Sequence, residues 1–369
     1  MSQSVQSRSV TGNFVRHFGV GLALIVAASA ALLFSDPRWR REQRAADAPK
    51  KVAIINYVSV PTLEDGEAGV IAGMKEHGFV DGTNISLTRY NAEGDRSTAI
   101  MIAKEVVGGD FDLIVTISTP VLQAVATANV ETRRPHVFTL STDPWAAGVG
   151  LFRDKVPQHP PYMTGQQSLP PVARLFEMAR ESNPNLKKVG VVWNPAESNS
   201  EASTKLARAI CQKLKIDLVE MTVDSSSGVQ EAARALISRE VEAIWAGGDA
   251  TVAAAHDTLI GTAREGGIPV FSNMLGNVKD GALFSVGPDY YEVGRGGGQL
   301  AARILKGADP ASIPVENFAP EVLALNLIAR DLFKTKWKFG ADWAKRASLI
   351  VDDKGPHQQQ PAASATSKP

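Results

Sequence analysis

The 369-residue chain contains a single cysteine, Cys211. One thiol excludes an intramolecular disulfide framework, a cysteine-based zinc site and a cysteine-ligated iron–sulfur cluster. The six histidines are scattered along the chain, and none has the spacing of a metal site. We therefore expect neither a metal nor another cofactor.

The chain also lacks net charge, because 39 Lys and Arg residues balance 39 Asp and Glu residues. A neutral chain has no overall electrostatic attraction to nucleic acid, which argues against DNA or RNA as the main partner. Hydrophobic residues make up 44% of the sequence, so the chain can build a large core. Its length predicts two domains or one large one.

The usual catalytic motifs are absent. There is no G-x-S-x-G elbow of an α/β-hydrolase and no phosphate-binding G-x-x-x-x-G-K-[ST] loop. The glycine-rich run at 294–298 lacks the G-x-G-x-x-G spacing, because Gln299 stands at the last position. We interpret this run as a helix start that packs closely against its neighbours. With no catalytic constellation, the protein is not expected to be an enzyme.

An uncharged and almost wholly apolar stretch runs from Phe18 to Phe34. As a helix it would span about 25 Å, slightly less than the roughly 30 Å hydrocarbon layer of a membrane. It predicts either an uncleaved membrane anchor or a cleaved signal peptide, whose cleavage pattern would be Ala28-Ser29-Ala30. Arginines are denser after the stretch than before it, which opposes export by the positive-inside rule. The polar residues 35–49 are interpreted as a linker, so residues 1–49 precede the folded body.

The body, residues 50–351, alternates strand-like and helix-like segments. In the first half, strands are predicted at 52–56, 85–90, 112–117 and 136–140, separated by helices at 67–77, 96–107 and 120–129. The pattern repeats with strands at 188–193, 217–223, 241–245 and 268–271, separated by helices at 201–215, 228–239 and 250–265. This α/β pattern predicts two similar doubly wound parallel-sheet lobes, although any large α/β protein has some such rhythm. Residues 352–369 are low in complexity and are predicted to be a disordered tail.

Small polar residues follow the carboxyl ends of the predicted strands, where ligands bind in open parallel sheets. Pro120 suits the first position of a helix with Thr119 as its N-cap, and Ser198 or Asn199 can cap the helix near residue 201. Free N–H groups at a helix start bind carboxylate or phosphate. Each hydroxyl can equally serve only as a cap, but the set would line one cleft from both sides. We therefore expect ligand contact.

Asp143 and Asp249 each follow an apolar strand, where a buried carboxylate needs a partner. The ammonium group of a ligand is one such partner, and a backbone turn or a nearby arginine is another. Asp143 precedes Pro144 and can be a turn residue. The sequence leaves both roles open.

Five short motifs occur in a fixed order: NAEGD at 91–95, ISTP at 117–120, STDP at 141–144, WNPAESNS at 193–200 and DYYEVG at 289–294. In these motifs the chain resembles the ABC transporter substrate-binding proteins of the tryptophan/tyrosine (aromatic amino acid) type. These proteins have the type I periplasmic-binding fold. The resemblance extends from about residue 51 to about residue 351.

The resemblance implies two lobes joined by a three-segment hinge. The first lobe would comprise residues 50–146 and about 287–310, and the second about 165–286 and 320–351. The helix 290–305 would return the chain to the first lobe. Ligand would bind between the lobes and favour their closure.

Carried onto this chain, the binding positions of the family are Ser118, Thr119, Thr142, Asp143, Asn194, Glu197, Ser198, Asn199, Asp249, Thr251 and Asp289. The helix starts at Thr119 and Asn199 could donate to the carboxylate of an α-amino acid. Asp249 or Asp289 could accept from its ammonium group. Tyr57 could stack on an aromatic ligand, or could pack beside the cleft.

The resemblance implies the periplasmic solute-binding component of an ABC import system, tethered to the inner membrane or secreted. Its partners would be a small organic solute, such as an aromatic amino acid, an ABC permease and its ATPase. A membrane-anchored ligand sensor that signals through a partner without transport would have the same cleft and is the alternative. The chain departs from the family pattern at Trp145 and at Ser168, where an acidic residue is frequent, and these changes affect the cleft rim.

Overall fold

The computed structural model describes residues 22, 29, 48–154 and 158–359. The predicted anchor or signal peptide at 18–34 therefore lies outside the described residues, apart from two isolated positions. In the part of the chain that is described, no helix is long and apolar enough to cross a membrane.

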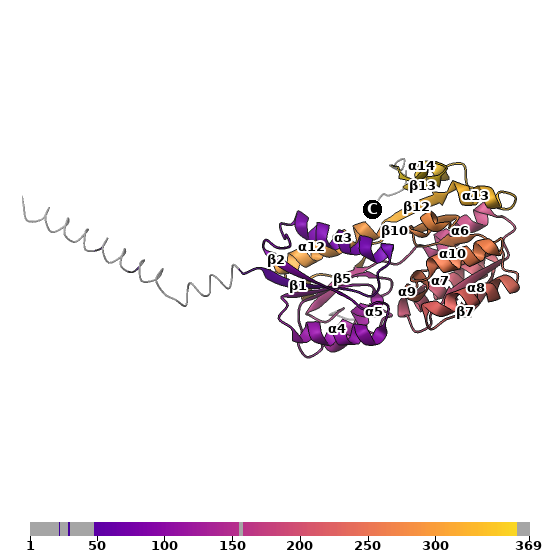
Figure 1. Ribbon diagram of the computed structural model, residues 1–369. Helices are drawn as coiled ribbons and strands as arrows, with labels where there is room; N and C mark the ends of the chain where they lie inside the picture. Colours follow the sequence, from indigo (N-terminus) through magenta and orange to yellow (C-terminus); the bar gives the residue numbers. More distant parts are fainter. Residues whose placement is uncertain (1–21, 23–28, 30–47, 155–157, 360–369) are drawn as a thin grey trace, which may run out of the picture. The chain divides into compact units, whose positions relative to one another are not determined.

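The first lobe is built on a sheet of six strands in the order β11-β5-β4-β3-β1-β2, and every neighbouring pair is parallel. Its strands are β1 (Lys50–Asn56), β2 (Ile85–Asn91), β3 (Leu113–Ile117), β4 (His136–Ser141), β5 (Met163–Gln167) and β11 (Glu316–Asn317). Its helices are α3 (Pro61–Glu76), α4 (Arg96–Gly108), α5 (Thr119–Ala128) and α12 (Tyr290–Leu305). Figure 1 shows α3 and α12 on one face of this sheet and α4 and α5 on the other. The strands are apolar along their length because both faces are covered.

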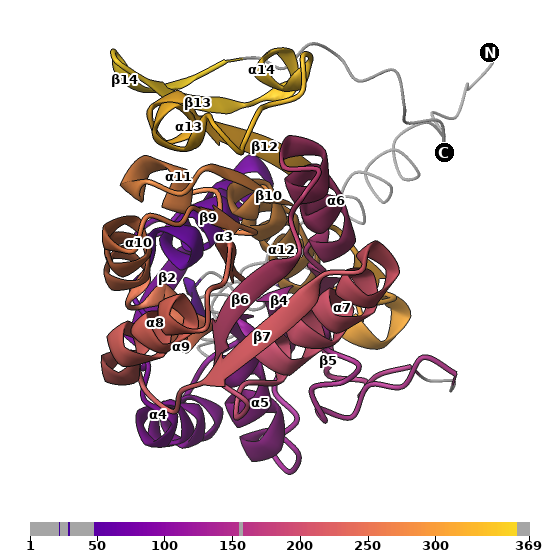
Figure 2. The ribbon, with the colours of Figure 1, turned by 90° about the vertical axis from the view of Figure 1, so that its right-hand side faces the viewer.

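The second lobe is built on a sheet of eight strands in the order β14-β13-β12-β10-β9-β8-β6-β7. Its strands are β6 (Lys188–Trp193), β7 (Asp217–Thr222), β8 (Ala243–Ala246), β9 (Val270–Ser272), β10 (Phe284–Pro288), β12 (Glu321–Asn326), β13 (Leu349–Asp352) and β14 (Gly355–Gln358). Its helices are α6 (Val172–Ser182), α7 (Ser198–Leu214), α8 (Val229–Ser238), α9 (Ala250–Ala253), α10 (His256–Glu265), α11 (Asn277–Asp280), α13 (Leu327–Phe333) and α14 (Trp343–Arg346). In Figure 2, α6 and α7 lie on one side of β6 and β7, and α8 and α10 lie on the other.

The five parallel strands from β6 to β10 repeat the order of β1 to β5, which confirms the predicted pair of similar doubly wound lobes. The chain passes between the two sheets three times: from β5 to α6, from β10 to α12 and from β11 to β12. These three connections form the hinge.

Helices α3 and α12 touch backbone to backbone, and glycine makes this possible. A Cβ atom on Gly69 would lie 2.1 Å from the carbonyl oxygen of Tyr291, and one on Gly298 would lie 2.1 Å from that of Val70. No real Cβ atom approaches an oxygen so closely, so any larger residue would force the helices apart. The glycine-rich run therefore packs closely against a neighbouring helix, as predicted, but it lies inside α12 rather than at its start, because α12 begins at Tyr290.

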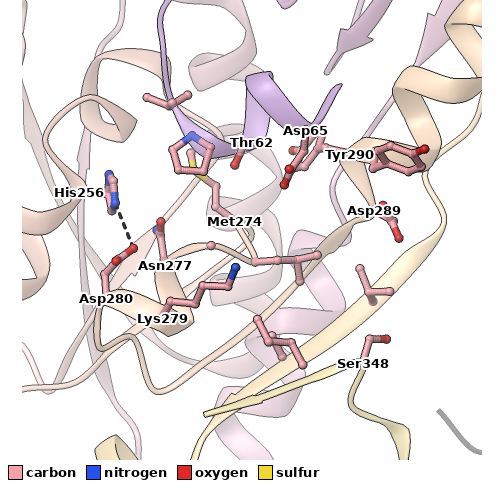
Figure 3. A pocket seen from close by; sticks show the side chains of 18 of the residues that line it. Thr62, Asp65, His256, Met274, Asn277, Lys279, Asp280, Asp289, Tyr290 and Ser348 are labelled. Atoms are coloured by element: carbon pink, nitrogen blue, oxygen red, sulfur yellow. Dashed lines mark hydrogen bonds and ion pairs between the residues drawn. The ribbon is translucent and has the colours of Figure 1, made fainter. Parts of the chain in front are cut away.

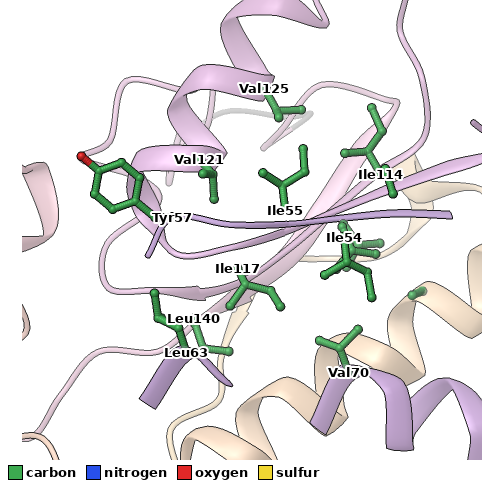
Figure 4. Packing of buried hydrophobic residues seen from close by; sticks show 14 of the residues in the cluster. Ile54, Ile55, Tyr57, Leu63, Val70, Ile114, Ile117, Val121, Val125 and Leu140 are labelled. Atoms are coloured by element: carbon green, nitrogen blue, oxygen red, sulfur yellow. The ribbon is translucent and has the colours of Figure 1, made fainter. Parts of the chain in front are cut away.

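Each lobe has its own apolar core. In the first lobe, side chains from β1 and β3 pack between helices on both faces; Ile54 and Ile117 are fully buried (Figure 4). The second core is aromatic, with Phe271 and Phe284 stacked at a centroid distance of 5.8 Å and Phe176 meeting Phe271 edge to face. Burial of such surfaces stabilises each lobe by about 25 cal/mol for each Å² of apolar area.

Three predictions from the sequence are wrong in detail. The tail is not disordered from residue 352, because β14 pairs with β13 in a hairpin whose turn uses Gly355 at φ 96°. The first lobe does not end at 146 and about 310, because β5 and β11 belong to its sheet. The segment 250–265 is two helices rather than one, since Ala255 leaves the helical conformation at φ −128°.

Candidate ligand-binding site

A small chamber lies between the lobes, at the carboxyl ends of both sheets. Ser118, Thr119 and Thr142 of the first lobe and Asn199 and Asp249 of the second line it, together with apolar side chains. We call this the central chamber. Its volume is about 50 Å³.

Ser118 is the most unusual residue of the central chamber. Its backbone has φ 100° and ψ 159°, a conformation that is essentially restricted to glycine. The residue is 6% exposed, and its Oγ atom is buried with no hydrogen-bond partner among the described residues. It directly precedes α5, whose first turn has free backbone N–H groups. Backbone strain and an unpaired hydroxyl therefore occur together at a helix start that faces the other lobe.

Asn199 supplies the corresponding group from the second lobe. Its Nδ2 atom donates to Glu197 Oε2 at 3.0 Å and to the carbonyl oxygen of Gly248 at 2.9 Å. These two bonds fix the amide, and they leave Oδ1 buried and unpartnered in the described structure. A buried acceptor without a donor costs about 1–3 kcal/mol, which a ligand N–H group would recover.

Asp249 lines the central chamber, but its carboxylate already has protein partners. It accepts from the backbone N of Asn194 at 2.6 Å, from Ser200 Oγ at 2.5 Å and from the backbone N of Val252 at 2.7 Å. Burial, followed by the charge of nearby Glu197, raises the pKa of Asp249 to about 7. The residue therefore caps α9 and ties it to β6 and α7.

Glu197 has a similar position. Its carboxylate accepts from the backbone N of Ala250 at 2.9 Å, the backbone N of Thr251 at 2.8 Å and Thr251 Oγ1 at 2.6 Å. With Asn194, Thr251 and Tyr57, it lines a second chamber of about 900 Å³. No cation pairs with Glu197 or Asp249 among the ion pairs of the described residues, so this wall of the cleft is electronegative.

Tyr57 packs beside the cleft, which is one of its two predicted roles. Its hydroxyl donates to the carbonyl oxygen of Gly94 at 2.7 Å, and its ring belongs to the first-lobe core (Figure 4). Burial, followed by the charge of Glu197, raises the pKa of Tyr57 to about 12. The phenol is therefore neutral and fixed in place.

The three remaining predicted residues line neither the central chamber nor the second chamber. Asp143 forms a turn, accepting from the backbone N of Trp145 at 3.2 Å, and pairs with Arg153 at 3.5 Å. Ser198 is the first residue of α7 rather than its cap, just as Thr119 is the first residue of α5. Asp289 caps α12 by accepting from the backbone N of Glu292 at 3.1 Å.

Asp289 lines a third chamber of about 750 Å³, together with Asp65, Lys279 and His256 (Figure 3). The apolar residues of the central chamber were not among the predicted site residues; Leu63, Leu140, Met274 and Tyr290 are the largest of them. An apolar residue that faces a cleft cannot be told from one in a core by its pattern alone, so the sequence carries no signal for them.

The profile of the ABC transporter substrate binding protein family matches residues 51–333. The chain belongs to this family. It is 28% identical over 287 residues to the tyrosine-binding protein of Clostridioides difficile, covering 77% of this chain and 81% of that protein.

Two solved structures are similar to this substrate-binding protein with a TM-score of 0.76. One is a conserved domain protein of Vibrio cholerae, 32% identical, with 82% of this chain and 99% of that chain covered. The other is an ABC domain of Streptococcus pneumonia in complex with L-Trp, 25% identical, with 82% and 100% covered. The fold is that of the solute-binding proteins, and the substrate-binding protein is not an enzyme.

Proposed function

We propose that this substrate-binding protein binds an α-amino acid in the central chamber and delivers it to an ABC import system. The observation that carries the proposal is the pair of buried, unpartnered atoms, Ser118 Oγ and Asn199 Oδ1, contributed by opposite lobes to one chamber. A native structure rarely leaves such atoms without a hydrogen bond. A ligand that forms hydrogen bonds with both atoms would stabilise the closed arrangement of the two lobes.

The chemistry of the two walls suits a zwitterion. On the first lobe, Ser118 Oγ and the free N–H groups at the start of α5 can donate to a carboxylate. On the second lobe, Asn199 Oδ1 can accept from an ammonium group, and the nearby carboxylate of Glu197 provides a favourable electrostatic field. Because the carboxyl oxygens of Asp249 already accept from protein donors, Asp249 holds this wall in place rather than making the direct contact that the sequence suggested.

The size of the central chamber requires the lobes to move. A volume of about 50 Å³ holds only a few water molecules, since each needs about 10–15 Å³ of accessible volume, and is too small for an amino acid. Ligand entry therefore needs the lobes to separate about the three connections of the hinge, followed by closure around the ligand. Because the relatives bind tyrosine and L-Trp, an aromatic amino acid is the first ligand to test.

In this role the protein would act in the periplasm. There, an ABC permease with its ATPase would bind the closed, ligand-loaded form. This part of the proposal rests on membership of the family. An uptake assay with the permease and ATPase reconstituted in vesicles tests it: ligand import should require the binding protein. Binding without any import would support a sensor instead.

Equilibrium dialysis of the purified protein against each proteinogenic amino acid tests the binding step. We expect saturable 1:1 binding of one amino acid or a few related ones. Ser118→Ala should weaken that binding, whereas Ser238→Ala should not, because Ser238 lies on the exposed side of α8. If no amino acid binds, or if Ser118→Ala binds as tightly as the parent, the assignment of the central chamber is wrong.

A further inference from the structure

A histidine and two aspartates converge at one side of the third chamber. His256 and Asp257 begin α10, and Asp280 ends α11. His256 Nε2 lies 3.0 Å from Asp280 Oδ2 and 3.4 Å from Asp257 Oδ1. Figure 3 shows His256 and Asp280 pointing toward one another. In each of these three residues one possible metal-ligand atom, a ring nitrogen or a carboxylate oxygen, lies within 4.8 Å of the other two. Among the described residues, they are the group of His, Cys, Asp or Glu residues with this arrangement.

The tautomer of His256 is fixed by the backbone. Its Nδ1 atom lies 2.7 Å from the carbonyl oxygen of Ala253, which can only accept a hydrogen bond. Nδ1 therefore carries a proton. In a neutral imidazole, Nε2 would then present a lone pair to two carboxylate oxygens, which is electrostatically unfavourable. A cation between these atoms would relieve this repulsion, and it is either a second proton or a metal ion.

Charge and geometry both favour a metal ion. An imidazolium balances one of the two carboxylate charges, whereas a divalent cation balances both. In a tetrahedral site with metal–ligand bonds of about 2.0–2.1 Å, the ligand atoms are about 3.3 Å apart. The observed separations of 3.0 and 3.4 Å bracket this value. A carbonyl oxygen on the opposite ring nitrogen is also the usual outer partner of a metal-bound histidine.

We propose that His256, Asp257 and Asp280 form a binding site for a divalent cation of the Zn²⁺ type. One nitrogen and two carboxylate oxygens are ligands that Zn²⁺ accepts, and a fourth position remains for water from the chamber. The neighbouring cation does not block the site, because the Lys279 side chain extends away from Asp280 (Figure 3). The bound ion would join the start of α10 to the end of α11 within the second lobe.

The histidine and aspartate spacing could not reveal this site in the sequence. His256 and Asp257 are adjacent, but Asp280 comes from another helix and meets them only in the folded lobe. The site is also independent of the central chamber, since none of its three residues lines that chamber.

Isothermal titration of the untagged full-length protein with ZnCl₂ at neutral pH tests the proposal. We expect one equivalent of Zn²⁺ to bind, with affinity weakened at least about tenfold in His256→Gln and in Asp280→Asn. Asp257→Asn is a further variant that cannot unfold the protein, because its side chain is 78% exposed. His77→Gln removes a histidine of the first lobe and is the matched control; it should bind Zn²⁺ as the parent does.

Two results would overturn the proposal. If Zn²⁺ does not bind, the cation between the side chains is a proton, and His256 is an imidazolium paired with two carboxylates. If Zn²⁺ binds equally well to the parent, Asp257→Asn and Asp280→Asn, the ion lies elsewhere on the protein.

Discussion

Replacing Ser118 by glycine should stabilise the ligand-free protein and weaken ligand binding at the same time. The backbone of Ser118, at φ 100° and ψ 159°, stores about 1–3 kcal/mol of strain that glycine does not have. Glycine costs about 0.5–1 kcal/mol in conformational entropy, so a net gain of about 1 kcal/mol remains. The lost hydroxyl contact to a charged ligand group should cost about 1.5–3 kcal/mol, or roughly 10- to 100-fold in affinity.

Ser118→Ala is the matched variant that separates these two effects. It removes the same unpartnered Oγ atom but keeps the strained backbone. Urea unfolding of the ligand-free proteins should therefore rank Ser118→Gly as more stable than Ser118→Ala, while titration calorimetry should give both variants the same weakened affinity. If the glycine variant is no more stable than the alanine variant, the conformation of Ser118 is not strained and the reasoning fails.

Three further outcomes follow from the structure. Gly298→Ala should destabilise the protein by several kcal/mol in urea unfolding, because the new Cβ atom would meet a carbonyl oxygen of α3. Gly261→Ala is the control: this glycine has open space around it, so alanine should stabilise the protein by up to about 1 kcal/mol. Equal effects of the two substitutions would contradict the helix contact. Burial lowers the pKa of His136 to about 3, so the folded protein holds it neutral, and stability should fall as the pH drops from about 6.5 toward 3. The His136→Gln variant should lose less stability over that interval, and parallel curves would exclude His136 as the cause. Asp249→Ala should lower the stability of the ligand-free protein by about 2–3 kcal/mol in thermal unfolding, because the backbone N–H groups of Asn194 and Val252 lose their acceptor. An unchanged melting temperature would show that these hydrogen bonds do not stabilise the fold.

The strands and helices were largely predictable because apolar residues mark them directly. The bounds of β6 agree with the prediction to the residue, and those of α12 agree with what the family resemblance implied. The strand β5 was missed because its sequence, MTGQQ, is polar although most of it is buried. Its Gln167 side chain donates to the carbonyl oxygen of Thr142, so burial here depends on a tertiary partner that no local pattern encodes.

The candidate site was predictable in position but not in detail. Ser118 and Asn199 were expected in the cleft from their place after parallel strands, and both line the central chamber. The strain at Ser118 and the full set of partners of Asp249 could not be foreseen. Whether a carboxylate faces a ligand or a backbone N–H group depends on a few ångströms of tertiary geometry.

The glycine contact between α3 and α12 has a consequence for the order of folding. Glu76 of α3 and Arg295 of α12, which pair across this contact, are 219 residues apart in the chain. During synthesis most of the first lobe emerges early, yet one face of its sheet is covered by α3 alone until α12 has left the ribosome. The strands β6 to β10 of the second lobe have been made by then, so the first lobe cannot close before much of the second lobe has emerged. An exposed apolar sheet that waits so long is vulnerable to aggregation, and a chaperone that binds nascent chains would protect this lobe first.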